Sequence, residues 1–230
     1  MPRRKSVLAS MLMLVVCARV ATAQQTRDFA PYMIGDRNGE VSLARTAAPK
    51  FISDSATVLV LTRKGYVEAE RGTNGFTCFV ARSFAGRVDD SDFWNVKTRA
   101  PHCLNPPAVR TILPEMVKRA EWVLAGVAPA EIWTRTLRMY GTRELPMPEA
   151  GAMAYMLSRR QLLAAANSPW HPHLMFYYPS SVSPMTFGAA GFSAPVINGS
   201  AGDEKNPVMT VLIPVPQWSD GTPAVAKAGH

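Results

Sequence analysis

The stretch ATVLVLTRKGYVEAERGTNGFTCFVAR, residues 56–82, carries the strongest secondary-structure pattern in the chain. Branched and aromatic residues dominate three runs within it, and Lys64-Gly65 and Asn74-Gly75 interrupt these runs with residue pairs typical of tight turns. The pattern predicts three strands in an antiparallel meander. Both faces of the third run are mostly apolar, which is typical of a central strand. We therefore expect an antiparallel sheet around this stretch.

Apolar residues at helical spacing occur on both sides of the meander. Residues 36–48 form one such segment, with a cap at Asp36 or Asn38. Residues 114–126 and 129–141 each begin with proline, carry an apolar stripe and end with glycine, and two residues separate them. These patterns predict an N-terminal helix and a central helical hairpin packed on the sheet. The predicted fold class is α+β.

Strand patterns return in the last third of the chain. Residues 152–157, 170–178 and 207–215 are short apolar runs bounded by proline, glycine or polar residues. Ser158 and Gln161 form a capping-box pattern, which predicts a short helix after the first of these runs. We expect three further strands here.

The first 23 residues have the composition of an export signal. Three basic residues precede an apolar run over residues 6–18, and small residues at positions 21–23 suit cleavage. The apolar run is shorter than a membrane-spanning helix requires. We therefore expect no transmembrane segment in the mature chain.

Cleavage between Ala23 and Gln24 predicts a periplasmic or secreted protein. A lipid anchor on Cys17 is disfavoured, because Val16 stands just before it, where lipidation requires a small residue. The pattern favours plain cleavage of the signal.

The mature chain is long enough for one domain with its own core. No repeat or linker divides residues 24–230, so we predict a single domain whose ends, residues 24–35 and 221–230, are poorly ordered. Removal of the signal leaves 21 basic and 17 acidic residues, a net charge of +4. No basic run interleaves with aromatic residues, so we expect no nucleic-acid partner.

Two cysteines, Cys78 and Cys103, remain after cleavage. In an oxidising compartment an isolated pair predicts a disulfide, whose loop closure contributes roughly 3.5 kcal/mol by chain entropy. The alternative is thiol catalysis by Cys103 with the adjacent His102, which requires a free thiolate. Export favours the disulfide.

The stretch NSPWHPHLMFYYPS, residues 167–180, contains candidate metal ligands. Alternation places His171, His173 and Met175 on one face of a strand, and His102 is a further internal histidine. Two imidazoles with a thioether suit copper, and imidazoles alone suit zinc. The competing interpretation gives both histidines structural hydrogen bonds at the ragged start of a strand, because the proline between them removes a ladder donor.

The opposite face of this predicted strand contains Leu174, Phe176 and Tyr178. That face is wholly apolar, so we expect it to point into the core.

Aromatic residues gather around the proline- and glycine-rich loops of the last third. Binding clefts use such linings, and the candidate ligand-binding residues are Trp170, Tyr177, Tyr178 and Trp218, with Phe187 and Phe192 as further aromatic residues of these loops. The common hydrolase, nucleotide-binding and zinc-protease motifs do not occur in the sequence, so we assign no catalytic residue.

Two functions remain open. The first is a non-enzymatic module that binds a small molecule or a protein partner. The alternative is a metal-dependent enzyme or a copper- or zinc-binding protein that uses the face with His171 and His173. We expect no cofactor under the first function, and copper or zinc under the alternative.

Three motifs extend these observations. GTNGFTC at 72–78, HPHLMFYYP at 171–179 and VPQWSDGT at 215–222 resemble motifs in a set of uncharacterised exported bacterial proteins. The resemblance extends from about Asp36 to Thr222. It implies export, and it carries no activity, substrate or catalytic residue.

Overall fold

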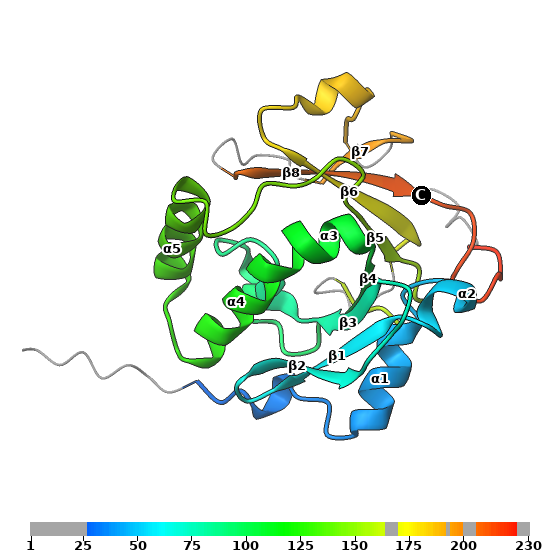
Figure 1. Cartoon of the computed structure of the whole chain (residues 1–230), viewed down its shortest axis with the longest axis horizontal. Coiled ribbons are helices and arrows are strands. Elements are labelled where there is room, and N and C mark those ends of the chain that lie inside the picture. Colours follow the sequence, from blue (N-terminus) through cyan, green and yellow to red (C-terminus); the bar gives the residue numbers. More distant parts are fainter. Residues whose placement is uncertain (1–26, 164–169, 192–193, 200–205, 225–230) are drawn as a thin grey trace, which may run out of the picture.

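One mixed sheet with helices against it forms the fold of the described residues (Figure 1). The computed structural model describes residues 27–163, 170–191, 194–199 and 206–224. The expected signal, its cleavage site and the last six residues lie outside the described residues. The α+β class is confirmed.

The strands follow the order β2-β1-β3-β4-β5-β6-β8-β7. They are β1 (Thr57–Thr62), β2 (Gly65–Glu70), β3 (Thr77–Ala81), β4 (Ala100–Leu104), β5 (Met153–Met156), β6 (His173–Pro179), β7 (Ile197–Asn198) and β8 (Val208–Pro214). The helices are α1 (Arg37–Arg45), α2 (Lys50–Ser53), α3 (Pro106–Thr111), α4 (Leu113–Leu124) and α5 (Pro129–Gly141), with 3-10 turns η1 (Ala30–Tyr32), η2 (Ser83–Ala85), η3 (Ser91–Trp94) and η4 (Pro184–Phe187). None of the helices in the described part of the chain has the length and apolar character needed to cross a membrane.

The sheet is mixed, which corrects the prediction of an antiparallel meander. β1 and β2 form a hairpin, but β3 lies on the other side of β1 and runs parallel to it, with Thr57 opposite Thr77. The connection crosses the end of β1, where the amides of Thr73 and Asn74 donate to the carbonyl of Ser55 at 2.8 and 3.3 Å. The stretch interpreted as a hairpin turn is therefore a crossover.

Gly72 permits this crossover. Its amide donates to Oγ1 of Thr57 at 3.0 Å, so the two backbones run close together. A Cβ atom at position 72 would overlap backbone atoms of Ser55, Ala56 and Thr57. Glycine is required here because two chain segments approach closely. The local sequence alone does not distinguish this role of glycine from its role in a tight turn.

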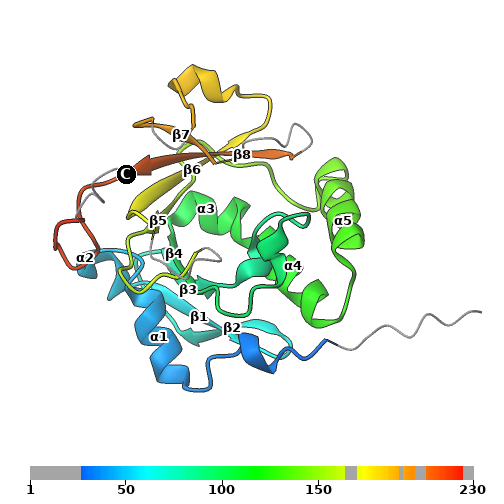
Figure 2. The same cartoon turned by 180° about the vertical axis from the view of Figure 1, so that it is seen from behind.

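Helices cover the two faces of the sheet differently (Figures 1 and 2). α1 packs on β1, β3 and β4, and the side chain of Asp36 accepts from the amide of Asn38 at 3.0 Å, which confirms the predicted cap. α3 and α4 lie on the opposite face. α5 packs mainly on α4, at the side of the sheet, which corrects the expectation that both helices of the hairpin pack on the sheet.

A buried ion pair joins α1 to the segment after β3. Nη2 of Arg82 lies 2.8 Å from Oε1 of Glu40, and both side chains are buried. The same carboxylate oxygen accepts from the amide of Leu61 at 3.1 Å, and Nε of Arg82 donates to the carbonyl of Tyr32 at 2.7 Å. Buried charges require such partners, so this network holds η1 against the sheet.

The disulfide between Cys78 and Cys103 is confirmed. The two cysteines are directly opposite each other on β3 and β4 and face α1. Thiol catalysis is therefore wrong: the sulfur of Cys103 is bonded to Cys78, and His102 projects on the other face of β4.

Residues 158–161 form a turn instead of the predicted short helix. The amide of Gln161 donates to the carbonyl of Ser158 at 3.3 Å, and the hydroxyl of Ser158 accepts from the amide of Arg160. The capping residues are used, but residues 161–163 are not helical, and the rest of the predicted helix, residues 164–169, lies outside the described residues.

Candidate functional site

The two faces of β6 have the opposite roles to those predicted. His173 and Tyr177 are buried, at 2 % and 5 % exposure, on the face that α3 and α4 cover. Leu174, Phe176 and Tyr178 are only half-buried on the other face. The prediction that the wholly apolar face is the core face was wrong.

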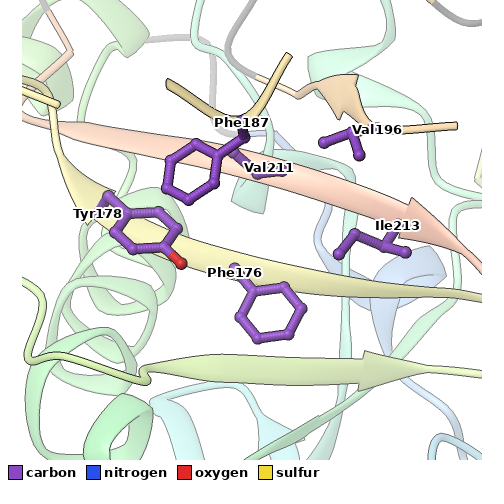
Figure 3. A pocket seen from close by; sticks show the side chains of 6 residues that line it. All are labelled: Phe176, Tyr178, Phe187, Val196, Val211 and Ile213. Carbon is purple, nitrogen blue, oxygen red and sulfur yellow. The ribbon is translucent and has the colours of Figure 1, made fainter. Parts of the chain in front are cut away.

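An apolar cleft of about 180 Å³ lies on this outer face (Figure 3). Its lining consists of Phe176 and Tyr178 from β6, Val211 and Ile213 from β8, Phe187 from η4, and Val196 before β7. The rings of Tyr178 and Phe187 lie with their centroids 4.6 Å apart. The cleft therefore offers mainly hydrophobic contact to a bound molecule.

The chain reaches over the cleft through a short helical turn. Ser183 caps η4, and the turn ends at Gly188, whose φ of 62° reverses the chain direction. Ala190 then pairs with Ile197, so that β7 returns along β8. Phe187 and Val196 thereby lie above the sheet, at the positions seen in Figure 3.

Of the predicted ligand-binding residues, only Tyr178 lines this cleft. Trp170 packs edge-on against His173 with ring centroids 4.5 Å apart, and Tyr177 belongs to the core on the other face. Trp218 lies in the turn after β8, where its amide donates to the carbonyl of Thr222 at 2.9 Å. The structure does not bring these four aromatic residues together.

Sequence reasoning missed four of the six lining side chains and named Tyr178 and Phe187, while Phe192 lies outside the described residues. The alternation of β6 already placed Phe176 on the same face as Tyr178. The positions of Phe187 and Val196 had no local signal, because they depend on how the segment between β6 and β8 folds back.

A second, larger cleft of about 610 Å³ lies between α1, α2 and the turn after β8. Most of its lining residues are polar or charged, and the charged groups neutralise one another: Arg45 pairs with Glu70, and Lys50 lies 3.8 Å from Asp54. A ligand there would have to replace existing ion pairs and water. We therefore regard the smaller apolar cleft as the stronger candidate.

His102 on β4 and His173 on β6 are buried on the same face of the sheet. Each ring places Nδ1 beside a backbone carbonyl, that of Ala100 at 2.9 Å and that of His171 at 2.8 Å. A carbonyl only accepts, so Nδ1 carries the proton and Nε2 carries none. Burial lowers the pKa of both histidines to about 4, so both rings are neutral at pH 7.

The other two predicted metal ligands are His171 and Met175. His171 is exposed and precedes β6, and Sδ of Met175 accepts from the Tyr177 hydroxyl at 3.7 Å. Within the ranges that the structure describes, no three His, Cys, Asp or Glu side chains are grouped closely enough to hold a metal ion. Of the predicted set, the structure places His102 and His173 buried on one face of the sheet and leaves His171 exposed.

Comparison of the chain with protein-family models, with curated proteins and with solved structures gave no match. Geometry and chemistry are thus the basis for assigning a function.

Proposed function

We propose that this protein is an exported binding module and that the cleft on β6 and β8 holds a small apolar or aromatic molecule. The observation that carries this proposal is the apolar lining, contributed by two strands and the segment that folds over them. An apolar cavity of about 150 Å³ is large enough for benzene. A volume of about 180 Å³ therefore suits one aromatic ring or a short branched hydrocarbon.

Two further features support the proposal. The lining contains no carboxylate, imidazole or thiol among its six side chains, which favours binding over catalysis. The disulfide between Cys78 and Cys103 suits an oxidising compartment, in agreement with the export signal expected from the sequence.

Titration of the mature protein with fluorobenzene, followed by ¹⁹F NMR, tests the site. We expect saturable binding that Ile213→Phe weakens at least tenfold, because the added ring occupies the cleft. Val67→Phe adds a ring to the exposed strand β2 at the other end of the sheet and should leave binding unchanged. Equal binding by Ile213→Phe and the wild type, or no saturable binding by the wild type, would overturn the proposal.

A further inference from the structure

Three adjacent strands place His102, Met156 and His173 in one row across the sheet. Met156 on β5 is directly opposite His173 on β6. β4 and β5 pair Cys103 with Tyr155, and the next residues in that register are His102 and Met156. Directly opposite residues project on one face with Cβ atoms about 4.5–5.5 Å apart. The row therefore sets one thioether between two imidazoles.

Aromatic rings enclose the two ends of this row. The ring of Phe79 stacks on His102 with centroids 5.6 Å apart, and Trp170 packs edge-on against His173. His102, Met156 and His173 are 6 %, 4 % and 2 % exposed. In such surroundings an ion of charge +1 is less costly to desolvate than one of charge +2.

The hydrogen bonds of both histidines suit metal binding. Because Nδ1 of each ring donates to a backbone carbonyl, the rings are oriented and Nε2 is the nitrogen with a free lone pair.

Gln161 adds an independent observation beside His173. Its Nε2 donates to the carbonyl of Trp170 at 2.7 Å and lies 3.5 Å from the carbonyl of His171, which also accepts from His173. Its Oε1 is the only buried side-chain oxygen in the described part of the chain that lacks a hydrogen-bond partner. Buried polar atoms without a hydrogen-bond partner are uncommon, and a bound ion nearby is one of their explanations.

We propose that His102, Met156 and His173 form a binding site for Cu(I), on the opposite face of the sheet from the apolar cleft. His102 and His173 lie on the two strands that flank the strand of Met156, each about 4.8 Å away across the sheet, and all three side chains project on one face. Soft thioether and imidazole ligands suit Cu(I). The site is separate from the proposed small-molecule site and does not depend on it.

Anaerobic titration of the mature chain with Cu(I), in competition with bicinchoninate, tests the site. We expect one Cu(I) per chain, with one sulfur and two imidazole ligands by X-ray absorption. Met156→Leu conserves volume and apolar packing, so it should keep the melting temperature, weaken Cu(I) binding at least tenfold and remove the sulfur ligand.

Two variants serve as controls. Met209→Leu replaces a buried methionine on the other face of β8 and should bind Cu(I) as the wild type does. His171→Ala removes the exposed histidine and should also keep binding. Cu(I) affinity that Met156→Leu leaves unchanged, or that only His171→Ala lowers, would overturn the proposal, as would the absence of a 1:1 complex.

Discussion

At the scale of single residues, Gly72 determines how β3 can join the sheet. The chain crosses the end of β1 at this residue, with its amide bonded to Thr57. Any Cβ atom there meets backbone atoms, which cannot rotate away as a side chain can.

We therefore expect Gly72→Ala to lower the free energy of unfolding by about 3 kcal/mol or more. Urea denaturation monitored by circular dichroism measures this change. Gly141→Ala is the matched control, because a Cβ atom at the end of α5 meets no atom within 4 Å and the change should stay below about 1 kcal/mol. Similar losses in the two variants would contradict the steric explanation.

At the scale of elements, β3 and β4 are joined by backbone hydrogen bonds and by the Cys78–Cys103 disulfide. The disulfide links two central strands of the sheet. These strands lie between the hairpin of β1 and β2 on one side and the strands that carry the apolar cleft on the other.

Replacement of both cysteines by alanine should lower the free energy of unfolding by about 2–5 kcal/mol, because the unfolded chain gains conformational freedom. Thermal or urea denaturation measures the loss. Dithiothreitol should lower the free energy of unfolding of the wild type to about that of the variant. It should leave the free energy of unfolding of the variant unchanged. A variant as stable as the oxidised wild type would show that the disulfide contributes nothing to folding.

At the scale of the whole molecule, the neutral histidines in the core link stability to pH. The pKa of His102 and of His173 is about 4 in the folded protein, lowered by burial from 6.5. Between these values the unfolded chain binds more protons than the folded one, so the free energy of unfolding falls as pH decreases.

We expect metal-free protein to lose stability from pH 7 to pH 5, by at most about 1.4 kcal/mol per pH unit for each histidine. Urea denaturation at several pH values measures the slope. His171→Ala, which changes an exposed ring, should retain the slope, and His173→Gln should reduce it. Stability that stays constant or increases on acidification would contradict this prediction.

The candidate sites show which site residues the local sequence can predict and which it cannot. Tyr178 and His173 were identified as site residues because aromatic rings and imidazoles are chemically distinctive in any pattern. The sequence places Met156 only in a predicted strand. A methionine can be recognised as a candidate ligand only when its neighbours on the adjacent strands are known. Phe187 lines the cleft through a fold-back that no periodicity describes.

The sequence by itself determined the features that depend on residues close together in the chain, and those for which only one arrangement is possible. Asp36 caps α1 through the next turn of chain, proline and glycine bound α5, and two cysteines allow one pairing. Only the tertiary structure decided the direction of β3, the covered face of β6 and the row of His102, Met156 and His173. Alternation separates the two faces of a strand, but which face is covered depends on segments distant in the chain.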